Sequence, residues 1–133
     1  MNKDIKSYIE EFSKMKEGEK ISNPELCILI CDRAQFTRRS LKHFVESRLK
    51  ARNSKEEIYY LIDKAPEVIN KPQINISNTN KTYPNSFLLG RFYGDVNKAV
   101  IVILDRDNDI RDIISLHFKN KSDFDYLIKL DSK

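Results

Sequence analysis

The chain has 133 residues, a mass of 15.7 kDa and a formal net charge of +4. This is the length of one domain, so we expect a single domain over residues 1–133. No apolar run approaches the ~20 residues of a membrane helix and no signal-peptide pattern opens the chain, so we expect a cytoplasmic protein without a membrane partner. The absence of Walker and dinucleotide motifs excludes those two nucleotide-binding classes.

Positive charge is concentrated in one segment. The segment from Arg33 to Lys55 contains eight basic residues and a single acid, Glu46. It therefore carries a charge of +7, and the remainder of the chain carries −3. A basic surface on an otherwise slightly acidic chain is typical of proteins that bind a polyanion. The alternative is a solvated helix face without a partner. The eight residues are Arg33, Arg38, Arg39, Lys42, Arg48, Lys50, Arg52 and Lys55.

The first third of the chain predicts a helix and a strand. Apolar residues recur at helical spacing over residues 2–16, and Gly18 ends this helix. The apolar run 26–31 fits a short buried strand, although a helix is possible at this length. It contains Cys27 and Cys31, which we interpret as two buried free thiols in a reducing compartment.

Two further helices follow. Thr37 is a suitable N-cap for a helix that runs to about Ala51. Ser54 caps a second, short helix, with Glu57 at the capping-box position, and Pro66 is expected to end it.

From residue 72 onward the period of the sequence changes from helical to two. Strands are predicted over residues 73–77, 86–93, 99–104 and 110–118, followed by a short helix over 122–130. Helices first and strands in a meander afterwards predict an α+β fold, with N-terminal helices packed on an antiparallel sheet and a short C-terminal helix.

Strand periodicity sorts the polar residues onto faces. Arg91 and Tyr93 share one face of their strand, and Arg111, Ser115 and His117 share the face of the last strand opposite its apolar side. These side chains are therefore expected on one sheet surface, ~10 Å apart, and the alternative is that this surface is simply solvated. Asp112 falls on the apolar side of the last strand, which suggests an edge or a bulge there.

No cofactor or metal is predicted. A zinc site at the cysteines would need further ligands at set spacing, and the chain has only His43 and His117 to offer. Asp105, Asp107 and Asp109 alternate like the start of a calcium loop, but Ile110 stands where that loop needs Gly, so we interpret them as a solvated turn.

His43 lies among arginines and lysines on the helix that begins after Thr37. A histidine that titrates near neutrality can transfer a proton beside a phosphodiester, while neighbouring cations stabilise the charge that develops on the phosphate. The 2′-OH of RNA can attack its own phosphodiester, so such cleavage needs only a base, an acid and a cluster of cations.

The run from Thr37 to Arg48, which contains Ser40-Leu41-Lys42-His43, resembles the Ser-Leu-Lys-His helix of phage-type nucleases in the Barnase–EndoU–Colicin–RelE superfamily. The later part is also similar, with the segment Pro66-Glu67-Val68-Ile69, strands that carry Arg91-Phe92-Tyr93 and a β-β-α ending. The resemblance covers residues 25–130 and leaves residues 1–19 outside, as a cap, a dimer element or a remnant of a larger polypeptide. It implies helices on a curved antiparallel sheet of about four strands.

The resemblance also implies a metal-independent endoribonuclease, often used as a toxin, with RNA as its substrate. It implies an inhibitor or antitoxin protein as a further partner. Delivery by a toxin system is the alternative to a cytoplasmic role. His43 would match the helix histidine, with Arg39 and Lys42 beside it, and the polar position of the last strand would fall on Ser115 or His117. In the resulting hypothesis His43 or His117 is the base, and the other histidine or Tyr93 is the acid. The phosphate is assigned to Arg38, Arg39, Lys42, Arg48, Arg91 and Arg111.

A binding module that uses the same basic surface without catalysis is the rival hypothesis. Its partner would be RNA, DNA or an acidic protein. A third possibility is an interaction domain without a nucleic-acid partner, and such a domain would show no salt-dependent binding to RNA or DNA.

Overall fold

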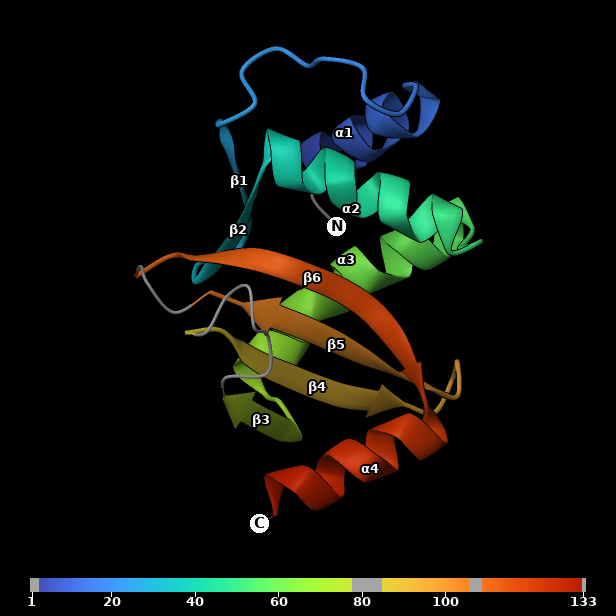
Figure 1. The fold of residues 1–133 in the computed structure, drawn as a ribbon, viewed down its shortest axis with the longest axis vertical. Coiled ribbons are helices and arrows are strands. Elements are labelled where there is room, and N and C mark those ends of the chain that lie inside the picture. The colour runs from blue at the N-terminus through green and yellow to red at the C-terminus, as the bar shows by residue number, and fades with distance from the viewer. Residues whose placement is uncertain (1–2, 78–84, 106–108, 133) are drawn as a thin grey trace.

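The computed structural model describes residues 3–77, 85–105 and 109–132 and shows an α+β fold (Figure 1). The described residues form four helices and a six-stranded mixed sheet. The helices are α1 (Lys3–Lys14), α2 (Arg38–Lys50), α3 (Lys55–Asn70) and α4 (Lys121–Asp131). The strands are β1 (Cys27–Cys31), β2 (Ala34–Thr37), β3 (Ile74–Ser77), β4 (Phe87–Tyr93), β5 (Lys98–Leu104) and β6 (Arg111–Asn120).

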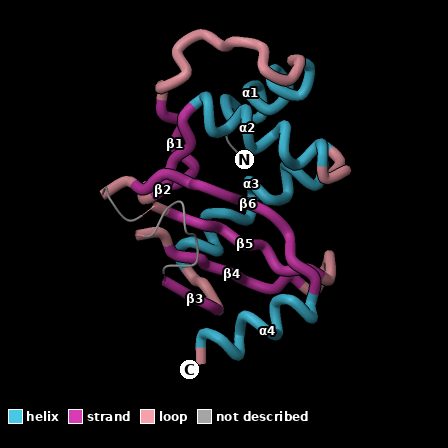
Figure 2. Tube along the Cα trace, viewed as in Figure 1, coloured by secondary structure: helices cyan, strands magenta, loops and turns pink. Residues whose placement is uncertain are grey.

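The sheet has the strand order β1-β2-β6-β5-β4-β3 (Figure 2). The four predicted strands form β3 to β6, an antiparallel meander, as the period of two indicated. The expected sheet of four antiparallel strands is nevertheless too small, because a β1–β2 hairpin joins it through a parallel pairing of β2 with β6. Strand β2 was not predicted, since its four residues follow Asp32-Arg33 directly and run straight into the N-cap of α2.

Strand β1 lies at the end of the sheet and is less buried than its apolar sequence predicts. Ile28 lies in the core, whereas Leu29 is 52% exposed and Cys27 is also exposed. The two cysteines are free thiols, but the expectation that both are buried is wrong for Cys27, because its side chain points away from the core.

Helices α3 and α4 cover opposite faces of the sheet (Figure 1). The apolar side of α3 packs on β4, β5 and β6, while Phe124 of α4 lies in a smaller core beyond the sheet. Ser54 and Glu57 form the predicted capping box of α3. Pro66 does not end α3, which runs on to Asn70. The packing of Ala65 and Val68, both fully buried, outweighs the hydrogen bond that proline removes.

Helix α1 packs against α2 and belongs to the main core. Ile5, Ile9 and Phe12 are buried in the same apolar cluster as the core side of α2, α3 and β6. Four ion pairs join α1 and the loop after it to basic residues further along the chain: Arg38–Glu11, Lys55–Glu10, Lys50–Glu17 and Arg39–Glu25. Residues 1–19, which fall outside the resemblance, therefore contribute core side chains to this fold.

Strand β6 carries the irregularity that Asp112 suggested. Leu104 pairs with Ile113 and Ile103 pairs with Ser115, so Ile114 is an extra residue between them. This bulge places Ile113 in the main core together with Leu116, although simple alternation assigned Ile113 to the polar face. It also separates the face of Arg111 from the face of Ser115 and His117.

Candidate functional site

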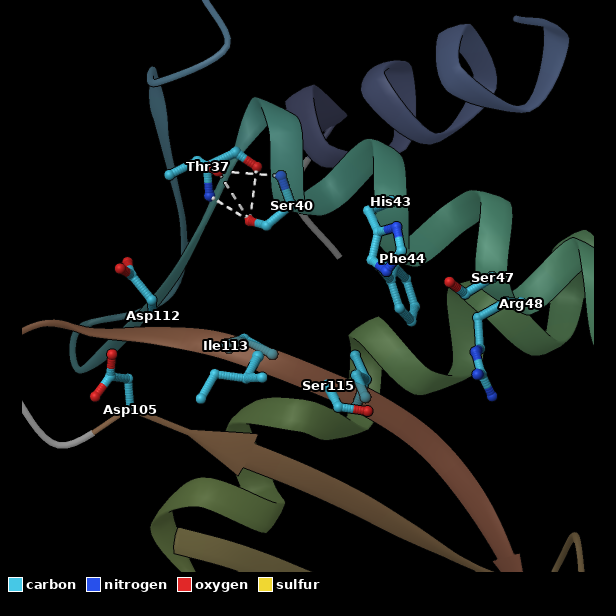
Figure 3. A pocket seen from close by; sticks show the side chains of 12 residues that line it. Thr37, Ser40, His43, Phe44, Ser47, Arg48, Asp105, Asp112, Ile113 and Ser115 are labelled. Atoms are coloured by element: carbon cyan, nitrogen blue, oxygen red, sulfur yellow. Dashed lines mark hydrogen bonds between the residues drawn. The ribbon is translucent and has the colours of Figure 1, made fainter. Parts of the chain in front are cut away.

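A cavity of about 290 Å³ lies between α2 and β6 (Figure 3). It is lined by Thr37, Ser40, His43, Phe44, Ser47, Arg48, Asp105, Asp112, Ile113, Ile114, Ser115 and Leu116. Three of the ten predicted site residues, His43, Arg48 and Ser115, therefore share one cavity.

Helix α2 supplies one wall of the cavity because of its helical spacing. Thr37 and Ser40 form a capping box in which the Ser40 amide donates to the Thr37 hydroxyl at 3.1 Å, and this fixes where the helix begins. Positions three, four, seven and eight residues after Ser40 then fall on the same side of the helix. They bring His43, Phe44, Ser47 and Arg48 toward β6.

His43 is exposed at the rim between two cavities. The second cavity, of about 400 Å³, lies where the loop after α1 meets α2, and its lining also includes Arg39, Lys42 and Glu46. His43 is thus accessible from both sides of the helix.

Strand β6 supplies the opposite wall. Ser115 Oγ and His117 Nδ1 lie 2.8 Å apart, and both residues are half-buried. Burial, reinforced by the nearby cations Arg48 and Lys119, lowers the pKa of His117 to about 4. His117 is therefore neutral at pH 7, and one of the two groups donates to the other according to the tautomer of the imidazole.

Arg48 differs from most of its basic neighbours in having no carboxylate partner within the described part of the chain. Its guanidinium is partly buried at the cavity, and this desolvation lowers its pKa from the usual value. A desolvated cation beside neutral His117 can bind an anion, because no carboxylate among the described residues forms an ion pair with it.

The other basic residues of the segment are largely used within the fold. The guanidinium of Arg38, whose side chain is 11% exposed, lies over the rings of Tyr8 and Phe12 and pairs with Glu11 at 3.3 Å. These contacts hold α1 against α2. Arg38 does not line the cavity.

Arg39 and Lys42 also lie outside the main cavity. Arg39 is exposed and pairs with Glu25 at 2.6 Å, and the nearly buried Lys42 pairs with Glu46 on the next turn of α2. Both line the second cavity. Their charges are available to a ligand only in competition with these carboxylates.

Arg91 and Tyr93 lie on the other face of the sheet from Ser115 and His117. The Tyr93 hydroxyl donates to Glu67 of α3 at 2.6 Å, and Arg91 donates to the Lys71 carbonyl at 3.0 Å. Burial and the Glu67 carboxylate raise the pKa of Tyr93 far above its usual value. Ser115 and His117 stand opposite Ile103 and Ile101, which pack on the α4 side.

Arg111 lies on the α3 side as well. Its guanidinium is 4.7 Å from the centre of the Phe87 ring. The bulge at Ile114 explains why the expected common surface does not form, since it reverses the alternation between Arg111 and Ser115.

Sequence reasoning missed the hydroxyls of Thr37, Ser40 and Ser47, which line the cavity beside His43. Ser40 and Ser47 lie three and four residues from His43 on the predicted helix, and this spacing is a signal that points to them. Among the described residues no cluster of three or more His, Cys, Asp or Glu side chains is arranged to hold a metal ion. The turn predicted at residues 105–109 includes residues 106–108, which lie outside the described part of the chain.

Comparison of the chain with known protein families, with curated proteins and with solved structures found no match. Within the described residues no helix is both long and apolar enough to cross a membrane.

Proposed function

We propose that this protein is a metal-independent endoribonuclease that acts at the cavity between α2 and β6. The observation that carries the proposal is that this cavity gathers His43, an accessible proton acceptor, and Arg48, a desolvated cation without a carboxylate partner in the described part of the chain. The resemblance of residues 37–48 to a nuclease helix supports the same activity.

In the proposed reaction His43 takes the proton from the 2′-OH of the nucleotide 5′ to the cleaved bond. The 2′-oxygen forms a bond to phosphorus, the bond from phosphorus to the 5′-oxygen breaks, and that oxygen takes a proton from water at the open rim of the cavity. Arg48 binds a non-bridging oxygen and stabilises the charge that develops on the phosphate. The products are a 2′,3′-cyclic phosphate and a 5′-hydroxyl end.

Neither His117 nor Tyr93 acts as the general acid in this scheme. His117, whose pKa is lowered to about 4, carries almost no proton at pH 7. Tyr93 lies on the opposite face of the sheet, where its hydroxyl bonds to Glu67. His117 instead holds the Ser115 hydroxyl in position at the cavity wall.

The test is cleavage of a mixed-sequence RNA oligonucleotide in EDTA. We expect products with cyclic phosphate ends, a rate lowered ~10²–10⁴-fold in His43→Ala, and an unchanged rate in the control Lys129→Ala on exposed α4. The same oligonucleotide with 2′-deoxyribose throughout should not be cut. Cleavage that needs a metal ion, or that survives in His43→Ala, contradicts the proposal.

A nucleic-acid-binding module without catalysis is the second candidate. It is favoured by the described lining of the cavity, in which His43 is the only histidine and no lysine or tyrosine occurs, so none of these side-chain types accompanies His43 as a general acid. Salt-dependent RNA binding at Arg48 without any cleavage would select this candidate.

A further inference from the structure

Strand β1 is the last strand at its end of the sheet, and among the described residues it pairs only with β2 (Figure 2). Within residues 3–77, 85–105 and 109–132 no backbone hydrogen bond outside the β1–β2 pairing involves Cys27–Cys31. The side chains beside the second edge of β1 are accessible, since Leu26 is 48% and Leu29 52% exposed. This edge can therefore be reached by another chain.

The backbone groups that face outward from β1 can be assigned from one hydrogen bond. The Arg38 amide donates to the Leu26 carbonyl at 2.9 Å, in the same register as the pairing of β1 with β2. Residues of an antiparallel pair point their N–H and C=O groups alternately toward and away from the partner strand. Leu26 and Ile28 therefore point these groups toward β2, whereas Cys27 and Leu29 point theirs outward. A bulge interrupts the register after Leu29, so the regular outward groups are those of Cys27 and Leu29.

A second copy of β1 matches these outward groups. Cys27 and Leu29 lie one residue on either side of Ile28. When two antiparallel copies of β1 meet about a two-fold axis at Ile28, Cys27 of each copy lies opposite Leu29 of the other. Every outward N–H and C=O group of these two residues then has a hydrogen-bond partner in the other copy.

The side chains of β1 also suit this pairing. Charged side chains often keep an edge strand from pairing, and the sequence Cys-Ile-Leu-Ile-Cys of β1 contains none. On the outer face, the exposed Cys27 and Leu29 lie beside their equivalents in the second copy. On the core face, Leu26 lies opposite Ile30 of the other copy, and Ile28 lies opposite Ile28. Apolar side chains therefore meet apolar side chains on both faces.

The charges that flank β1 allow a second copy to approach. Glu25, before the strand, pairs with Arg39 at 2.6 Å, and Asp32 and Arg33 follow the strand. Each flank thus has one acid and one base, and an antiparallel copy brings the two kinds of flank together without an excess of either charge. We propose that β1 pairs with β1 of a second copy, forming a two-fold dimer in which one sheet runs through both protomers. The dimer does not depend on the proposed nuclease activity.

Sedimentation equilibrium of the full chain without RNA measures the association. The paired strands are short, so we expect a reversible dimer with a Kd between ~1 μM and ~1 mM. Leu29→Lys places a charge at the pairing and should raise the Kd at least about tenfold. Leu130→Lys, at an exposed apolar side chain of α4, is the matched control and should associate like the wild type. A chain that stays monomeric up to ~1 mM, or an equal loss in both variants, overturns the proposal.

Cysteine crosslinking tests the register without the Leu29 variant. In the proposed dimer Cys27 is displaced from Cys27 of the other copy by two residues, ~7 Å along the strand, whereas Cys31 is displaced from its equivalent by six residues, ~20 Å. A short bismaleimide should therefore link Cys31→Ser, which keeps Cys27, into dimers. It should link Cys27→Ser far less, with yields compared per thiol that reacts with N-ethylmaleimide. An equal or greater yield in Cys27→Ser overturns the proposal.

Discussion

Ser115 Oγ and His117 Nδ1 lie 2.8 Å apart on one face of β6, two residues apart in the chain. The pair exists because the bulge at Ile114 turns this face of the strand away from the main core while Leu116, between them, stays buried. Arg48 reaches the same place from α2 and lowers the pKa of His117 together with burial. A neutral imidazole and a desolvated cation therefore stand side by side, and this arrangement has consequences that can be measured.

The first consequence is a loss of stability in mild acid. Because the pKa of His117 falls from 6.5 to about 4 on folding, the unfolded chain binds more protons between these values. The contribution to stability is present in full above pH ~6.5 and is lost as the pH falls toward 4. From pH 7 to pH 5 we expect the free energy of unfolding to drop by about 2 kcal/mol.

Urea unfolding at both pH values checks this, with His117→Gln as the variant that should lose most of the difference. Titration of the His117 ring by NMR gives the pKa directly. A midpoint at or above pH 6 would show that the imidazole is not desolvated.

The second prediction concerns Arg48 as an anion ligand. Arg48→Gln should weaken RNA binding about tenfold and reduce the salt dependence of that binding by about one released ion, because one phosphate contact is lost. Arg91→Gln is the matched control, since Arg91 lies on the opposite face of the sheet and bonds to Lys71. Fluorescence anisotropy over a salt series measures both. Equal losses in the two variants would place the RNA elsewhere.

The third prediction separates the structural arginines from the ligand-binding one. Arg38→Met removes the contacts of the guanidinium with Tyr8, Phe12 and Glu11, so we expect the free energy of unfolding to fall by about 1–2 kcal/mol. Arg39→Met, at a side chain that is 68% exposed, should change it by less than about 0.5 kcal/mol. Chemical denaturation of both variants measures these two changes in the free energy of unfolding. An unchanged stability in Arg38→Met would contradict the role assigned to this side chain in holding α1.

Local patterns were sufficient to predict the parts of the fold that local interactions determine. Thr37 and Ser54 could be identified as N-caps because capping depends on residues three positions apart, and the meander followed from its period of two. Strand β2 could not be predicted, because it is stabilised by pairing with β6, where Gln35 Nε2 donates to Asp112 Oδ1 across 77 residues of sequence.

The candidate site was predictable to the same limited extent. His43, Arg48 and Ser115 were named from residue type and helix or strand position, and the structure brings them to one cavity. The assignment of Arg91, Arg111 and Tyr93 to the same surface depended on unbroken alternation along β6. One extra residue in a strand reverses that alternation, and the bulge depends on long-range packing of Ile113 in the core.

The last prediction concerns Gly90, which lies in β4 between β3 and β5. A Cβ atom there would stand 2.8 Å from Ile101 Cδ1 and 2.9 Å from Ile74 Cδ1, closer than carbon atoms pack. Gly90→Ala should therefore destabilise the protein by about 1–3 kcal/mol through overpacking. Gly94→Ala, with no atom within 4 Å of the new Cβ, should change stability by less than about 0.5 kcal/mol. Adding Ile101→Val removes the nearest clashing atom, so the double variant should lose less stability than the sum of the losses in the two single variants. Urea unfolding of the wild type, both single variants and the double variant measures this. Strictly additive losses would show that the clash is not the cause.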